Sequence, residues 1–181
     1  MIDFGNFTMR IDQLCESTSL QTYKNWVKPN AQTVKDDYAQ YERESSRWEN
    51  RARSIQSLSP LFSSLEDFKE KLGSAEVKEI GKEFAARVHG MSLLKTISAL
   101  KSLIGTYSQP KELDRIIAGF EAGDKMPMPI LVKGKKGYAI LSGNTRCNAA
   151  FIQGIRPTVL IIDLSDKPEV QENRPLEVTK R

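Results

Sequence analysis

The chain has 181 residues, a hydrophobic fraction of 39% and a formal net charge of +4. This length suits one ordinary domain with room for an appended segment. No stretch approaches the roughly 18 consecutive apolar residues that a membrane span needs, so we expect no membrane partner. The mildly basic composition permits contact with nucleic acid or nucleotides, but many basic domains of this size have no polyanionic partner.

The cysteine and histidine contents argue against a zinc site. Cys15 and Cys147 are the two cysteines, and His89 is the one histidine. They lie far apart in the sequence and lack the spacing of metal ligands. The opening residues, MIDFGNFTMRIDQL, contain neither a basic nor an apolar signal region. We therefore expect a cytoplasmic protein with reduced thiols.

The first predicted element is a strand in residues 7–14, FTMRIDQL. Phe7, Met9 and Ile11 alternate with polar residues, which is the period-two pattern of a half-buried strand. We assign residues 1–17 to this first strand of the core of the fold.

Residues 18–105 are predicted to be mainly helical, and we interpret them as a helical insertion or lobe. The run from Asn30 to Ser57 is highly charged, with sparse apolar anchors at Tyr38, Tyr41, Trp48 and Ile55. A short helix is predicted within Pro60 to Leu72, a second from about Val77, and a third over Met91 to Ile104. Apolar residues at helical spacing support these helices.

Residues 106–165 have a different character and are predicted to form the core. Pro110 suits the first position of a helix that Gly123 ends. Strands are then predicted in MPILV, YAILS and TVLIID, with a turn at GKKG and a helix in TRCNAAFIQ. Residues 166–181 are a charged tail that we expect to fray. This order predicts an α/β (α+β) fold with a small mixed sheet.

The SGNTR stretch, residues 142–146, stands between a predicted strand and a predicted helix. The first N–H groups of a helix have no partner within it, and Ser142, Asn144 or Thr145 could cap them. Gly143 lets another group approach closely, and the Arg146 guanidinium matches phosphate oxygens. These five residues predict a phosphate-binding site. The alternative is an ordinary strand–helix junction with a solvated arginine.

The segment PMPILVKGKKGYAILSGNTRCNAAFIQGIRPTVLIIDL resembles the ParB/sulfiredoxin superfamily. The shared pattern is an apolar strand, a turn, a second strand, Gly-x-x-Arg, a small-residue helix ending in glycine, and an apolar strand. The resemblance covers about residues 110–165, with FTMRIDQL as a candidate opening strand. It does not explain residues 18–105.

The resemblance implies that nucleotide phosphates bind at Gly143, Asn144, Thr145 and Arg146. Members of the superfamily include CTP-binding partition proteins, an ATP-using sulfinic acid reductase, a free-serine kinase, and plasmid or phage proteins described as ATPases and DNA nucleases. The implied ligand is a nucleoside triphosphate, ATP or CTP, with Mg²⁺ as the expected metal. Plasmids and phages are plausible sources of such a chain.

Departures from the family pattern narrow the activity. Asn144 stands where sulfiredoxin has its nucleophilic cysteine, and Cys147 follows the arginine instead. We therefore do not expect sulfinic acid reduction, and we interpret Cys147 as a packed residue. The chain also lacks a downstream helix-turn-helix region, so we do not expect a clamp-forming partition protein.

Hydrolysis of a nucleotide or of DNA requires a carboxylate for metal or base chemistry. Glu16 and Asp12, beside the first predicted strand, are the catalytic candidates. Asp114 and Asp163 are further acids without a diagnostic partner. Each of these could instead be a solvated surface acid.

Lys133, Lys135 and Lys136 make the predicted hairpin turn basic. Such a turn could contact a DNA backbone, because phosphate contacts require only positioned charge. Lysines in hairpin turns are more often simply solvated.

Two functional hypotheses follow. The first is a ParB/sulfiredoxin-like ATPase, other NTPase or DNA nuclease. The alternative is a non-catalytic interaction module whose residues 18–105 bind a protein or nucleic acid partner.

Overall fold

The computed structural model describes residues 20–44, 47, 60–94, 96–104 and 110–167. The predicted strand in residues 7–14, the candidate acids Asp12 and Glu16, and residues 168–181 lie outside this set. The fold is a mixed arrangement of helices and strands, which confirms the α+β class.

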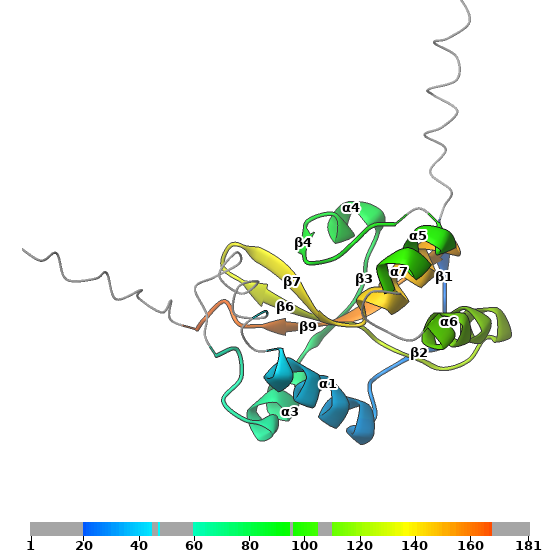
Figure 1. Ribbon diagram of the computed structural model, residues 1–181. Coiled ribbons are helices and arrows are strands. Elements are labelled where there is room, and N and C mark those ends of the chain that lie inside the picture. Colours follow the sequence, from blue (N-terminus) through cyan, green and yellow to red (C-terminus); the bar gives the residue numbers. More distant parts are fainter. Residues whose placement is uncertain (1–19, 45–46, 48–59, 95, 105–109, 168–181) are drawn as a thin grey trace, which may run out of the picture.

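The centre of the fold is a five-stranded sheet in the order β3-β9-β6-β7-β4 (Figure 1). β6 runs parallel to β9 and antiparallel to β7, while the outer strands are β3, antiparallel to β9, and β4, parallel to β7. The strands are β3 (Glu76–Glu79), β4 (Val88–His89), β6 (Ile130–Gly134), β7 (Gly137–Ser142) and β9 (Thr158–Asp163). This arrangement confirms the predicted small mixed sheet. It also confirms the strands that were predicted in the last third of the chain.

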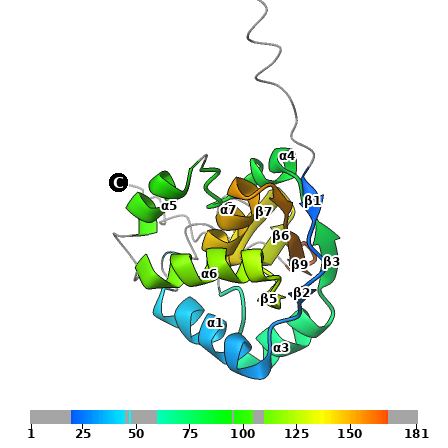
Figure 2. The same ribbon diagram turned by 90° about the vertical axis from the view of Figure 1, so that its right-hand side faces the viewer.

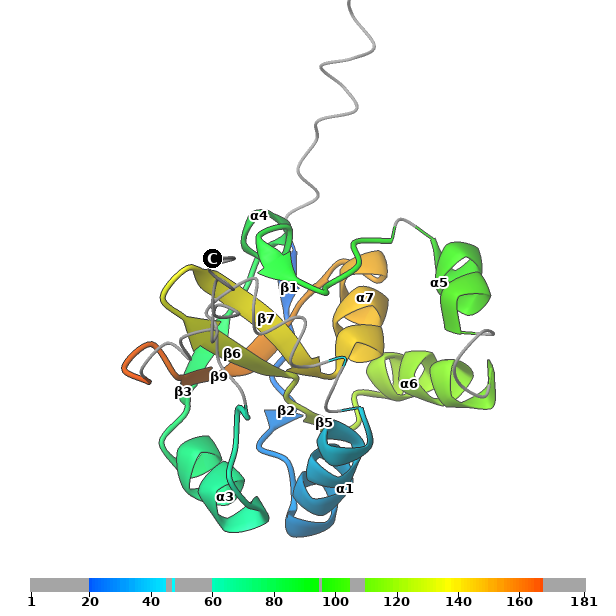
Figure 3. The same ribbon diagram turned by 60° about the vertical axis from the view of Figure 1, so that its left-hand side comes forward.

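Side chains alternate between the two faces of the sheet, and both faces are covered. On one face lie α1 (Ala31–Arg43) and α3 (Leu65–Gly73), side by side in Figure 3. The core on this side includes Val132, Leu141, Leu160, Tyr38 and Phe68. Aromatic rings fill the space between the helices and the sheet, because α1 presents Tyr38 and Tyr41 to the interior.

The opposite face packs against α4 (Lys82–Ala85) and α7 (Asn144–Ile152). Leu131, Ile140 and Val159 meet Val88 and Phe151 there. Because α7 begins directly after β7, its first turn lies at the end of the sheet where Ile130 pairs with Ser142.

Two further helices lie beside α7. They are α5 (Ile97–Ile104) and α6 (Pro110–Ala122), seen next to α7 in Figure 2. The prediction that α6 begins at Pro110 and ends before Gly123 is confirmed. None of the helices in the described ranges is long and apolar enough to cross a membrane.

Two short parallel strand pairs join the start of the described chain to its last third. β1 (Gln21–Thr22) pairs with β8 (Ile155–Arg156), and β2 (Trp26–Val27) pairs with β5 (Met126–Pro127). The ring of Trp26 packs edge-on against that of Phe120, which helps to fix this connection.

Residues 18–105 contain the helices α1, α3, α4 and α5, but they are not helical throughout. They contain β1 to β4, and they supply both outer strands of the central sheet. Val77 lies in β3 rather than at a helix start, and the predicted helix over Met91 to Ile104 begins only at Ile97. These outer strands were missed because β3 is rich in charged residues and β4 has two residues. The predicted tail is anchored at its beginning, since Lys167 Nζ donates to the Leu61 carbonyl.

Candidate functional site

Gly143 forms the junction between β7 and α7. It is the N-cap residue of α7 and has a φ of 86°, in the left-handed region that favours glycine. A Cβ at this position would lie 2.9 Å from the Pro129 Cα. Both the left-handed backbone conformation and the closeness of Pro129 therefore require glycine at this position. The sharp turn directs the start of α7 away from the end of the sheet.

The expected side-chain cap is absent from the start of α7. Neither Ser142, Asn144 nor Thr145 caps the helix, because the helix start has no side-chain cap hydrogen bond. The prediction of a cap from these residues is therefore wrong. Cys147 makes the first i→i−4 hydrogen bond of the helix: its N–H donates to the Gly143 carbonyl over 3.0 Å.

The backbone N–H groups of Asn144 and Thr145 have no acceptor in the part of the chain that the structure describes. Both residues are half-buried rather than covered. Oriented, unpaired N–H groups at a helix start attract anions, and the helix dipole adds to this attraction. The first turn of α7 can therefore accept an anion.

The side chain of Asn144 has a structural role. Its Oδ1 accepts from the Ser92 N–H over 3.3 Å and from Asn148 Nδ2 over 3.1 Å. Asn148 is buried, and its Oδ1 accepts from the Leu94 N–H over 3.0 Å. Together the two asparagines attach the segment before α5 to α7. The side-chain oxygen of Asn144 is therefore engaged within the protein.

Arg146 lies one turn inside α7 and is half-buried. Its Nη1 donates to the Pro127 carbonyl over 2.7 Å, which fixes the direction of the guanidinium. Burial raises the pKa of Asp37, and the positive charge of Arg146 partly offsets this effect. Arg146 thus lies in the first part of α7, where it contacts Pro127 and acts on the charge of Asp37.

Asp37 of α1 is the acid that the structure brings to this site. Ser142 Oγ donates to Asp37 Oδ1 over 2.7 Å, and the buried Asp37 Oδ2 has no hydrogen-bond partner within the described ranges. Burial raises the pKa of Asp37, the neighbouring Asp36 raises it further, and the Ser142 hydrogen bond and the Arg146 charge act in the opposite direction. Asp37, Ser142 and Arg146 therefore form one cluster at the end of the sheet.

Sequence reasoning missed Asp37 because it is one of many charged residues in the run from Asn30 to Ser57. A signal was nevertheless present. Val34, Tyr38 and Tyr41 form the buried stripe of α1, and Asp37 follows Val34 by three positions. Residues three apart lie on the same side of a helix, so the stripe placed Asp37 at its margin.

Cys147 is fully buried between α7 and the sheet. Burial raises the pKa of its thiol to about 12, although Arg146 acts in the opposite direction. A thiol with such a pKa is not a thiolate nucleophile at neutral pH. This environment agrees with the interpretation of Cys147 as a packed residue.

The basic turn and Asp163 lie at the other end of the central sheet. Lys133 pairs with Asp163 in register, whereas Ser142 pairs with Ile130 at the opposite end of β6. Lys133 Nζ donates to Asp163 Oδ2 over 2.6 Å. This bond, with those from Ser165, lowers the pKa of Asp163 to about 2. The predicted phosphate site and the predicted DNA-contacting lysines are therefore separate; Lys135 and Lys136 are exposed at the turn.

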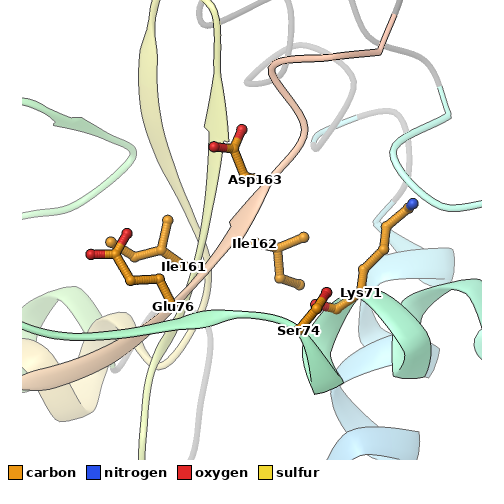
Figure 4. Close-up of a pocket in the computed structure, with 6 residues that line it drawn as sticks. All are labelled: Lys71, Ser74, Glu76, Ile161, Ile162 and Asp163. Carbon is orange, nitrogen blue, oxygen red and sulfur yellow. The ribbon is translucent and has the colours of Figure 1, made fainter.

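A pocket of about 250 Å³ also lies at that end, between α3, β3 and the end of β9 (Figure 4). Lys71, Ser74, Glu76, Ile161, Ile162 and Asp163 line it. Its Lys71 pairs with Asp67, and its Asp163 pairs with Lys133. Because these charges are neutralised within the protein, the pocket does not indicate a particular ligand. Asp114, another candidate acid, is exposed on α6.

Within the described ranges there is no group of three or more histidine, cysteine or acidic residues that could hold a metal ion. No protein-family model, curated protein or solved structure matches the chain significantly.

Proposed function

We propose that the chain is a ParB/sulfiredoxin-like protein that binds a nucleoside triphosphate at the first turn of α7 and hydrolyses it or cleaves DNA. One observation carries the proposal. The backbone N–H groups of Asn144 and Thr145 have no acceptor among the described residues, and Arg146 stands directly after them. This arrangement is suited to the oxygens of a phosphate group.

The local charges support an anionic ligand. The positive end of the α7 dipole and the Arg146 guanidinium both favour negative charge at this place. The negative charge of Asp37 disfavours an anionic ligand. The ligand and Asp37 would both interact with the Arg146 guanidinium and the positive end of the α7 dipole. Phosphoryl-transfer sites contain such acids, because positioning and charge stabilisation supply most of their catalysis. Asp37 is therefore a further candidate, beside Glu16 and Asp12, for the catalytic carboxylate.

The second candidate function is a non-catalytic interaction module. The bond from Arg146 to the Pro127 carbonyl favours it, because this bond attaches α7 to the strand before β6 and needs no ligand. In that case the cluster would stabilise the fold, and residues 18–105 would contact the partner. Loss of stability in Arg146 variants, together with no nucleotide binding by wild type, would support this alternative.

A nucleotide panel tests the proposed function. Thermal unfolding of the full chain with ATP, CTP, GTP and ADP, each with and without Mg²⁺, identifies ligands because a ligand of the folded state raises the Tm. Calorimetry then compares wild type with Arg146→Ala. We expect the variant to bind the selected nucleotide more than about tenfold more weakly, since it loses a charge-assisted contact.

Two further variants separate binding from folding. Arg87→Ala removes an exposed arginine elsewhere in the fold and is expected to leave affinity unchanged. Arg146→Lys keeps the charge but loses the planar fork, so we expect intermediate affinity. Unchanged affinity in folded Arg146→Ala would refute the role of the arginine. No binding of any nucleotide by wild type would refute the proposed function.

A further inference from the structure

Asp37 stands out because a buried carboxylate oxygen rarely lacks a partner. Its Oδ1 accepts from Ser142 Oγ over 2.7 Å, which fixes the orientation of the carboxylate. Its Oδ2 is also buried, yet no hydrogen-bond donor from the described residues reaches it. A buried oxygen without a partner costs free energy, and a bound ion is one of the established reasons for such an atom.

The neighbours of Asp37 define what could bind to Oδ2. The groups acting on its charge are Ser142, Arg146 and the adjacent Asp36. Ser142 is committed to Oδ1, and Asp36 is itself negative. Arg146 is the positive neighbour, but its Nη1 is directed to the Pro127 carbonyl. A positively charged ligand would therefore find an oriented carboxylate oxygen here.

A phosphate at the first turn of α7 increases this requirement for positive charge. It would add negative charge close to Asp37, and two anions repel each other in a partly buried site. Mg²⁺ resolves this conflict in many proteins, because it is held by one or two carboxylates together with phosphate oxygens.

We propose that Asp37 is the protein ligand of a divalent cation that also contacts the phosphate held at Asn144, Thr145 and Arg146. This proposal rests on the proposed function and extends it. It assigns the metal site to α1, outside the segment that resembles the ParB/sulfiredoxin superfamily. It also explains why α1, which precedes the central sheet in the sequence, is joined to the SGNTR turn by the hydrogen bond from Ser142 to Asp37.

Calorimetric titration of the full chain with ATP, and with any other nucleotide selected by the panel, tests the cation site. We expect removal of Mg²⁺ to weaken binding to wild type by about tenfold or more. Asp37→Asn keeps an oxygen acceptor for Ser142 but removes the negative charge. We expect this variant to bind the magnesium-free nucleotide more tightly than wild type does, and to respond to Mg²⁺ by less than about twofold.

The matched control is Asp36→Asn. Asp36 is the neighbouring acid, is exposed, and accepts from Gln32 within α1 over 2.9 Å. We expect the Asp36→Asn variant to retain the wild-type response of nucleotide binding to Mg²⁺. Electron paramagnetic resonance of Mn²⁺ gives a second readout: with nucleotide present, wild type and Asp36→Asn should retain bound Mn²⁺ and Asp37→Asn should lose it.

The outcomes distinguish the two proposals. Failure of every nucleotide to bind refutes the proposed function and the cation site together. Nucleotide binding that ignores divalent cations refutes the cation site alone. An unchanged Mg²⁺ response in Asp37→Asn also refutes it. If wild-type binding instead strengthens only at low pH, and Asp37→Asn abolishes that effect, a proton rather than a cation neutralises Asp37.

Discussion

Replacement of Gly143 by alanine is predicted to destabilise the fold through two separate effects. The first is conformational: at a φ of 86°, an alanine in the left-handed region costs roughly 1–2 kcal/mol. The second is steric, because the new Cβ would lie 2.9 Å from the Pro129 Cα. Overpacking of this kind typically costs about 1–3 kcal/mol. The expected loss in the free energy of unfolding is therefore about 2–5 kcal/mol.

Two other glycines separate these effects. Gly154 has a φ of 71° with no atom within 4 Å of its added Cβ, so Gly154→Ala should show the conformational cost alone. Gly73 has neither feature, and Gly73→Ala should be neutral or stabilising, by up to about 1 kcal/mol. Gly143→Ala should thus be less stable than Gly154→Ala by about 1–3 kcal/mol.

Urea and thermal denaturation of the three variants measure these differences. For a domain of this size, 1 kcal/mol corresponds to about 2–4 °C in Tm, so Gly143→Ala should melt about 2–12 °C below Gly154→Ala. Equal or higher stability of Gly143→Ala would refute the contact with Pro129 and, with it, the turn that directs the first amides of α7.

Two remaining predictions concern Asp163 and Cys147. Because Lys133 and Ser165 lower the pKa of Asp163 from its ordinary value of 3.8 to about 2, its contribution to stability should be present above pH 3.8 and lost as the pH falls toward 2. Asp163→Asn should remove that part of the acid dependence, and an identical acid-unfolding profile would contradict the ion pair. In a Cys15→Ser background, the buried Cys147 should react with a thiol reagent at pH 8 only after denaturation, and rapid labelling of the native protein would show that it is accessible.

The last third of the chain could be predicted from sequence because its signals are local. The alternation along β6, β7 and β9 places apolar residues on both faces of the sheet, and Pro110 and Gly123 mark the ends of α6. Gly143 was expected to allow a close approach, and Pro129 lies close to it. These features depend on residues close together in the chain.

The rest depended on distant contacts. β3 and β4 are short outer strands whose partners lie in the last third of the chain, so their own residues carry little period-two signal. Asp37 and Ser142 are separated by 105 positions, and no local pattern could have joined them. The expected helix cap also failed, because the side chain of Asn144 is used for contacts with Ser92 and Asn148.

Nuclear magnetic resonance of ¹⁵N-labelled protein tests the phosphate site most directly. During titration with the nucleotide selected by the thermal panel and Mg²⁺, the backbone amide signals of Asn144 and Thr145 should show the largest shifts, and Arg146→Ala should reduce them. If the nucleotide binds while these two signals stay unchanged, and signals of the turn at Lys135 and Lys136 move instead, the first turn of α7 is not the phosphate site.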